Sequence, residues 1–169
     1  MQHRRYVIPA VAVMGVLLAA CGSASSSSTS STSTSTSSTA APTVTTSSSQ
    51  YGEILTSASG VTYYLFTADS HDHSACTGAC TQAWHPVIAT HPTAGGGAKA
   101  SLLGTIVLPG GKHQVTYDGH PLYTFVDDSG PHVISGEGVH SFGGVWYVVS
   151  PNGSAITGSS SSSSSATGY

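Results

Sequence analysis

Short apolar and β-branched runs, separated by Gly, Pro, Asp and Ser, recur between residues 51 and 157. The run at 61–66, Val-Thr-Tyr-Tyr-Leu-Phe, has the composition of a β-strand, and a turn-forming stretch at 57–60 precedes it. These features predict a hairpin between the runs at 51–55 and 61–66. Because side chains alternate along a strand, Tyr64 and Phe66 are expected to share one face.

The second half of this region shows the same spacing of strands and turns. The runs at 113–117 and 120–125 flank Asp118-Gly119, and an Asp-Gly pair in that position is a strong hairpin signal. Pro121 predicts that the second of these strands lies at a sheet edge or begins late. Further strands are expected at 102–108 and 145–149, and no stretch has helical periodicity. The predicted fold class is therefore all-β: a small antiparallel domain of about seven short strands.

A tyrosine motif, Tyr-x-Phe-x-x-Asp, occurs twice, and each copy is followed by a polar loop that ends at a tryptophan. The matching positions are Tyr64, Phe66, Asp69 and Trp84, then Tyr123, Phe125, Asp128 and Trp146. Shared spacing of several landmarks indicates an internal repeat, over about 51–90 and 103–151. We expect the aromatic residues to fill equivalent core positions, with a ligand-stacking face as the alternative. We expect the aspartates to serve turns.

The segments on either side of this region have a different composition. Residues 1–20 have the layout of a secretory signal peptide, and Leu18-Ala-Ala-Cys21 resembles the lipobox of bacterial lipoproteins. This resemblance implies cleavage before Cys21 and lipid attachment to its thiol. Residues 21–50 are then expected to form a Ser/Thr-rich flexible linker, 51–157 the folded domain, and 158–169 a low-complexity tail.

The charge of the chain limits the classes of partner that it can bind. The chain has four Lys and Arg residues against seven Asp and Glu, and its formal net charge is −3 at pH 7. Two of the four basic residues, Arg4 and Arg5, lie at the N-terminus. A basic nucleic-acid-binding face is therefore excluded. The expected contacts are with the membrane through the N-terminal lipid and with a cell-wall or envelope protein.

Cysteine and histidine residues supply the candidate chemistry. An oxidising extracytoplasmic compartment favours a disulfide between Cys76 and Cys80, with a metal-ligating pair or a redox-active pair as alternatives. His71 and His73 form a His-x-His pair that could hold copper or zinc. The simpler interpretation is that they are surface histidines in a chain with few charges. No cofactor is expected.

The two tyrosine motifs, the Cys-x-x-x-Cys loop and the Trp84-His-Pro segment resemble a family of bacterial lipoproteins. That family is described as secreted repeats with a Tyr-x-(Phe/Trp/Tyr)-x-x-Asp motif. The resemblance covers about 51–151 and implies an extracytoplasmic location and a repeat architecture. It implies no catalytic residue, since the family has no established function. We therefore expect a lipid-anchored, non-enzymatic protein with an envelope-binding or structural role; the alternative is a metal-binding or redox accessory protein using His and Cys residues.

Overall fold

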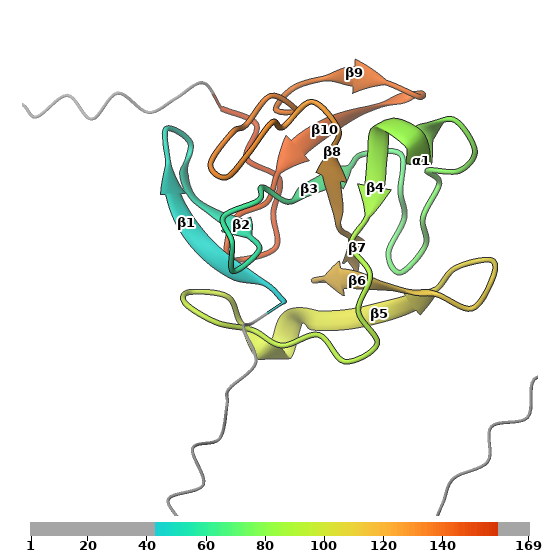
Figure 1. The fold of residues 1–169 in the computed structure, drawn as a ribbon, viewed down its shortest axis with the longest axis horizontal. Coiled ribbons are helices and arrows are strands. Elements are labelled where there is room, and N and C mark those ends of the chain that lie inside the picture. The colour runs from blue at the N-terminus through green and yellow to red at the C-terminus, as the bar shows by residue number, and fades with distance from the viewer. Residues whose placement is uncertain (1–42, 159–169) are drawn as a thin grey trace, which may run out of the picture. The chain divides into compact units, whose positions relative to one another are not determined.

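The computed structural model describes residues 43–158, which lie within one compact unit. The all-β class is confirmed, with three antiparallel sheets, one four-residue α-helix, α1 (Cys80–Ala83), and one 3₁₀ helix, η1 (Ala100–Leu102) (Figure 1). There are ten strands over these residues, several of only two or three residues, where the sequence predicts about seven. They are β1 (Thr45–Ser49), β2 (Gly52–Thr56), β3 (Tyr64–Phe66), β4 (Trp84–Pro86), β5 (Leu103–Val107), β6 (His113–Tyr117), β7 (His120–Pro121), β8 (Tyr123–Phe125), β9 (His140–Ser141) and β10 (Gly144–Val148).

The central sheet interleaves the two repeats. Its strand order is β4-β8-β3-β10-β9, so strands of the first repeat, β4 and β3, alternate with strands of the second, β8 and β10. Tyr64 of β3 is the register partner of Tyr123 of β8. On either side of that pair, Phe66 lies opposite Trp146 and Phe125 opposite Trp84. The repeats are therefore related by an approximate two-fold axis that passes between the two motif tyrosines.

Each repeat also begins with an equivalent hairpin. β1 pairs with β2 in the first repeat, and β5 pairs with β6 in the second. This corrects the predicted end of the linker at residue 50, because residues 45–49 form β1 and Val44 is fully buried. Ser and Thr tolerate an extended, hydrogen-bonded backbone, and here the partner strand β2 supplies the hydrogen bonds. Low apolar content alone did not reveal that partner.

The predicted turn at 57–60 is present, but the strand after it pairs with the central sheet and not with β2. Thr56 and Thr62 form an isolated antiparallel bridge, whereas β3 pairs with β8 and β10. Around Asp118-Gly119 the hairpin prediction is confirmed, since β6 pairs with β7 and both turn residues have positive φ. β7 ends at Pro121 on the edge of the sheet β5-β6-β7, as a missing N–H requires. The chain then crosses to the central sheet as β8.

The central strand β3 separates two hydrophobic clusters. Tyr64 and Phe66 belong to one cluster, while Tyr63 and Leu65 belong to the other, as period-two alternation requires. All four side chains are buried. The run at 61–66 is thus almost entirely apolar because both of its faces are covered. The hairpins β1-β2 and β5-β6 pack toward one face; the loops between each motif and its tryptophan, which we call the motif loops, pack toward the other.

Candidate functional site

The two motif tyrosines bond to the aspartates of the opposite repeat. The Tyr64 hydroxyl donates to Asp128 Oδ2 at 2.8 Å, and the Tyr123 hydroxyl donates to Asp69 Oδ2 at 2.8 Å. Each motif is therefore incomplete without the other copy. Along the sequence each motif tyrosine stands five residues before an aspartate, but the interleaved sheet brings it the aspartate of the other repeat, a partner that the sequence did not predict.

The second carboxylate oxygen of each aspartate holds a loop. Asp69 Oδ1 accepts the Ala75 N–H at 2.7 Å, and Asp128 Oδ1 accepts the Ser135 N–H at 2.8 Å. The prediction that the aspartates serve turns is confirmed in this respect. A carboxylate that accepts both a backbone N–H and a phenol fixes the loop relative to the opposite repeat.

Loop groups complete the surroundings of both phenols. The Ser74 hydroxyl lies 2.7 Å from the Tyr123 hydroxyl, and the Gly136 N–H donates to the Tyr64 hydroxyl oxygen at 3.2 Å. Burial raises the pKa of Tyr64 and of Tyr123 far above the ordinary tyrosine value, and the neighbouring carboxylates raise both further. Both phenols are therefore held in the neutral, hydrogen-donating form.

Burial also raises the pKa of Asp69, although the hydrogen bonds from Ala75 and Tyr123 oppose that shift. In the second repeat, Glu137 Oε2 accepts the Val148 N–H at 2.7 Å, and burial raises the pKa of this carboxyl as well. Sequence reasoning did not single out Glu137.

Four aromatic rings stack in a row beside the motif tyrosines, in the order Phe66, Trp146, Trp84 and Phe125; we call this row the aromatic stack. The ring centroids of Trp84 and Trp146 are 3.8 Å apart, with an interplanar angle of 2°. Phe66 stacks on Trp146 at 4.1 Å, and Phe125 stacks on Trp84 at 4.1 Å. Tyr64 meets Trp84 edge-on at 5.4 Å, and Tyr123 meets Trp146 in the same way at 5.1 Å.

The burial of these rings decides between the two interpretations of the motif. The tyrosines and tryptophans of the motif and Phe66 are at most 2% exposed, and Phe125 is half-buried. A ligand-stacking face built from them is therefore excluded, and the prediction of equivalent core positions is confirmed. Gly136 illustrates how closely the rings are covered: a Cβ at this position would lie 2.8 Å from the Trp84 ring and 2.9 Å from Tyr64.

The cysteine and histidine residues have separate roles. Cys76 and Cys80 form a disulfide, with their Cα atoms 5.3 Å apart, which leaves no thiolate there for a metal. His71 and His73 are both exposed, and His71 lies 3.1 Å from the Asp72 carboxylate. Within residues 43–158 no three His, Cys, Asp or Glu side chains group as metal ligands would. The metal-binding alternative therefore finds no support in the structure.

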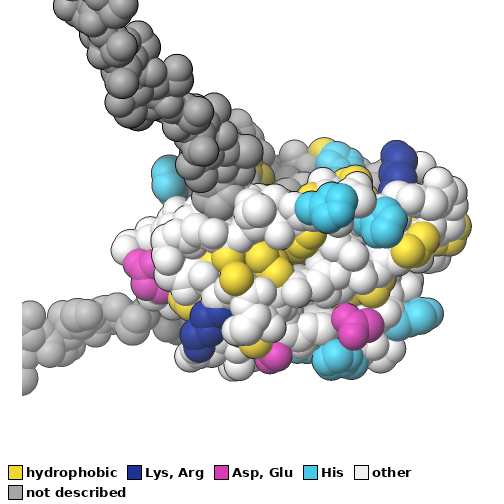
Figure 2. Space-filling view, turned by 90° about the horizontal axis from the view of Figure 1, so that it is seen from below, with side chains coloured by type: hydrophobic (Ala, Val, Ile, Leu, Met, Phe, Trp, Pro, Cys, Tyr) yellow, Lys and Arg dark blue, Asp and Glu magenta, His cyan; other side chains and the backbone are white. Residues whose placement is uncertain are grey.

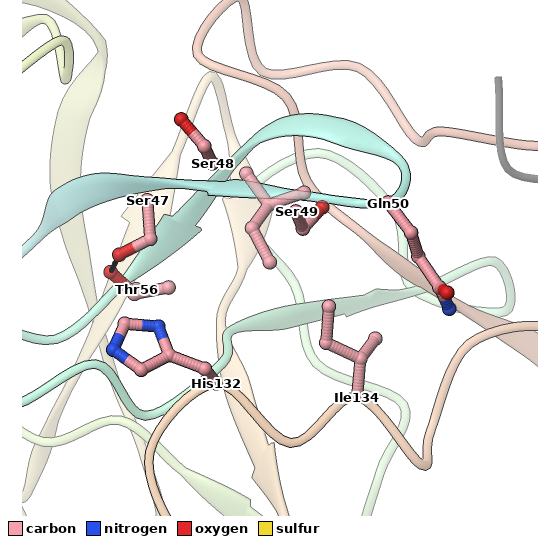
Figure 3. A pocket seen from close by; sticks show the side chains of 8 residues that line it. Ser47, Ser48, Ser49, Gln50, Thr56, His132 and Ile134 are labelled. Carbon is pink, nitrogen blue, oxygen red and sulfur yellow. Dashed lines mark hydrogen bonds between the residues drawn. The ribbon is translucent and has the colours of Figure 1, made fainter. Parts of the chain in front are cut away.

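Besides a cavity of about 240 Å³ beside His71 and Gly119, two larger surface cavities are lined by described residues outside the motif. The larger, of about 640 Å³, is a groove between the disulfide loop and the end of β5, and it is lined in part by Pro86, Ile106, Val107, Leu108 and Pro109. The smaller, of about 270 Å³, has the hydroxyls of β1 and β2 on one side and His132 and Ile134 on the other (Figure 3). No sequence motif marks either cavity, since each is formed by segments distant in the chain.

Lipidation was predicted at Cys21, which lies outside the described residues, as do the expected signal peptide and tail. Across the part of the chain that the structure describes, no helix has the length and hydrophobicity to cross a membrane.

Comparison with known protein families gives a match to both halves of the domain. The Lipoprotein_15 family model, described as a secreted repeat of unknown function, matches residues 45–88 and 104–150. These two matches coincide with the two structural repeats, including β1, which the sequence pattern left in the linker. Searches of curated proteins and of solved structures return no match. With both repeats matched over more than half of its length, this chain belongs to the family of secreted repeats of unknown function.

Proposed function

We propose that the protein is a lipid-anchored, extracytoplasmic binding module without enzymatic activity. The observation that carries this proposal is the closure of the motif. The phenols of Tyr64 and Tyr123 and the carboxylates of Asp69 and Asp128 bond to one another and to loop amides. The polar groups of the motif thus hold two loops in place beside a rigid core. A binding partner would therefore contact the surfaces that these loops form.

Anchoring is supported by the N-terminal sequence and by the family. Leu18-Ala-Ala-Cys21 follows a basic and then apolar segment, and the matching family is described as secreted and carries a lipoprotein name. Lipid at Cys21 would attach the domain to the outer face of a membrane. The free energy of membrane binding grows with the length of the acyl chains, by about 0.8 kcal/mol for each buried methylene.

The groove beside the disulfide loop is the surface that we assign to binding. Val107 at its margin is 67% exposed, although Val is usually buried. The side of the molecule on which β5 lies carries a cluster of hydrophobic side chains, with charged and His side chains spread around it (Figure 2). An apolar groove in a domain with few charges suits a cell-wall or envelope protein that offers an apolar segment.

Anchoring is tested by Cys21→Ser in the full chain. The variant is expected to be released from membranes or to remain as an uncleaved precursor, because the thiol is the lipid acceptor. Membrane fractionation and the mass of the N-terminal peptide measure this. Unchanged processing and membrane retention would show that the anchor is not at Cys21.

Binding is tested by sedimenting the released Cys21→Ser protein with isolated cell envelopes. A further change, Val107→Asp, places a charge in the groove and is expected to lower the bound fraction at least tenfold. The matched control is Val126→Asp, since Val126 is also exposed, at 53%, but lies outside the groove. Equal binding by the two aspartate variants would remove the groove from the proposal.

A further inference from the structure

The arrangement of the aromatic stack differs from what packing alone favours. Aromatic pairs in protein cores prefer edge-on or offset contacts, with centroids about 4.5–7 Å apart. Here three successive contacts, Phe66–Trp146, Trp146–Trp84 and Trp84–Phe125, have centroids 4.1, 3.8 and 4.1 Å apart. The interplanar angle between the indoles is 2°. Two indoles this close and this parallel are in face-to-face contact, so their π-systems are electronically coupled.

Such a pair is easier to oxidise than a single indole. Removing one electron leaves a positive hole, and two overlapping rings spread that charge over a larger area. The negative faces of the stacked phenyl rings of Phe66 and Phe125 stabilise the charge further, as they would any cation placed against an aromatic face. Among the buried rings, the Trp84–Trp146 pair is therefore the site that loses an electron most readily before any proton moves.

Each indole also contacts a phenol that can refill the hole. Tyr64 lies edge-on to Trp84, with centroids 5.4 Å apart, and Tyr123 lies edge-on to Trp146 at 5.1 Å. A phenol that loses an electron becomes strongly acidic and must release its proton. The Asp128 and Asp69 carboxylates already accept those protons in hydrogen bonds of 2.8 Å.

We propose that the aromatic stack is a one-electron donor to radical oxidants outside the cell. In the first step, an oxidising radical takes one electron from the Trp84–Trp146 pair and is reduced. In the second step, Tyr64 gives one electron to the indole pair while its phenolic proton moves to Asp128 Oδ2. The products are the reduced oxidant, neutral indoles, a Tyr64 phenoxyl radical and a protonated Asp128. The Tyr123 and Asp69 pair performs the same step in the other repeat.

The small size of the domain makes the stack reachable although it is buried. A domain of about 100 residues has a radius of gyration of about 13 Å, so an electron can pass between the core and the surface without the oxidant entering. Water is excluded from Trp84 and Trp146, which are 1% and 0% exposed. Burial shields the radical from side reactions with solvent.

Pulse radiolysis of the mature full chain with the azide radical, a one-electron oxidant selective for indole, tests the proposal. The indole-radical absorption is expected to appear first and to decay as the tyrosyl-radical band grows, at a rate independent of protein concentration. A tyrosyl band that never grows, or that grows in proportion to protein concentration, would overturn the proposal.

Removing the proton acceptors tests the role of the carboxylates. In Asp69→Asn/Asp128→Asn, growth of the tyrosyl band is expected to slow about tenfold, or about 1.4 kcal/mol in barrier height. The matched control, Asp72→Asn/Asp127→Asn, changes two exposed aspartates and should react as the unmodified protein does. Equal rates in the two variants would contradict the proposal.

A measurement without substitutions decides the matter if the first double variant does not fold. In the unmodified protein, growth of the tyrosyl band is expected to slow in D2O, because the phenolic proton moves to the carboxylate together with the electron. A rate identical in H2O and D2O would show that no proton moves together with the electron, and would overturn the coupled step.

Discussion

At the scale of the residue, the phenol–carboxylate bonds between the repeats are the most specific interactions in the domain. Asp128 Oδ2 accepts the Tyr64 phenol, and Asp69 Oδ2 accepts the Tyr123 phenol; both phenols are fully buried, and both carboxylates are half-buried. A hydrogen bond to a charged group contributes more than a neutral one, and an acceptor left without its donor is costly. Removing a single atom from one of these residues should therefore lower the free energy of unfolding measurably.

Tyr64→Phe removes one oxygen and leaves Asp128 Oδ2 without its donor. We expect the free energy of unfolding to fall by about 1.5–3 kcal/mol. The control is Tyr147→Phe, since the Tyr147 side chain is half-buried and its hydroxyl makes no hydrogen bond to any residue in 43–158. Denaturant unfolding measures both, and equal midpoints would show that the phenol–carboxylate bond is not stabilising.

Gly136 is expected to reject even a methyl group. A Cβ there would lie within 2.9 Å of the Trp84 and Tyr64 rings, and overpacking of this kind costs about 1–3 kcal/mol. Gly130→Ala is the matched control, because a Cβ at Gly130 meets nothing within 4 Å. Thermal unfolding should therefore separate the two variants, and a Gly136→Ala protein as stable as Gly130→Ala would contradict the packing described here.

The buried tyrosines also predict how stability depends on pH. Burial raises the pKa of Tyr63 to about 12 and moves the pKa values of Tyr64 and Tyr123 in the same direction. Their contribution to stability is complete below the ordinary tyrosine pKa of about 10 and is lost as the pH rises above it. We expect alkaline unfolding to coincide with ionisation of these phenols. Phenolate absorbance measures the ionisation. Ionisation of all tyrosines well before unfolding would contradict this.

At the scale of the element, the two motif loops are held in place by different interactions. The first loop contains the Cys76–Cys80 disulfide and α1 (Cys80–Ala83). The second has no cysteine, and Glu137 in it accepts the Val148 N–H of β10. The two loops are therefore held by different interactions, and the cysteines of the first loop have no counterpart in the second.

Replacing Cys76 and Cys80 by Ser should destabilise the domain without unfolding it. Closing so short a loop contributes about 2 kcal/mol on the chain-entropy model, and the Asp69–Ala75 hydrogen bond still holds the loop. The denaturant midpoint should fall by a matching amount, and the unmodified protein should show no free thiol from this pair. Reducing agent should lower the midpoint of the unmodified protein but leave the double-serine variant unchanged.

At the scale of the whole molecule, interleaving makes the two repeats one folding unit. In the run β4-β8-β3-β10 every neighbouring pair joins one repeat to the other. Neither repeat can complete its sheet, its phenol–carboxylate bond or its half of the aromatic stack by itself. A destabilising substitution in either repeat should therefore lower the stability of the whole domain.

Phe66→Ala and Phe125→Ala test this cooperativity. Truncating a buried Phe costs about 3–5 kcal/mol; we expect the full cost at Phe66, which is 2% exposed, and less at the half-buried Phe125. Each variant should unfold in one transition, with coincident fluorescence and circular dichroism. Two separate transitions would show that the repeats fold independently.

The sequence by itself determined the features that depend on neighbouring residues. Strand composition and turn residues predicted the all-β class, the Asp118-Gly119 hairpin and the edge position of Pro121. The recurrence of Tyr-x-Phe-x-x-Asp predicted two repeats with equivalent core positions. The repeat also held an unused signal for β1, because the hairpin at 103–117 implies a matching strand before Gly52–Thr56.

Only the tertiary structure decided which residues meet. The bonds from Tyr64 to Asp128 and from Tyr123 to Asp69 join residues more than fifty positions apart, and the same holds for the contact between Trp84 and Trp146. Local sequence fixes which face of a strand a side chain occupies, but the order of strands in the sheet fixes its partner. The alternation of repeats in the central sheet is therefore the physical reason why the motif closes on its own second copy.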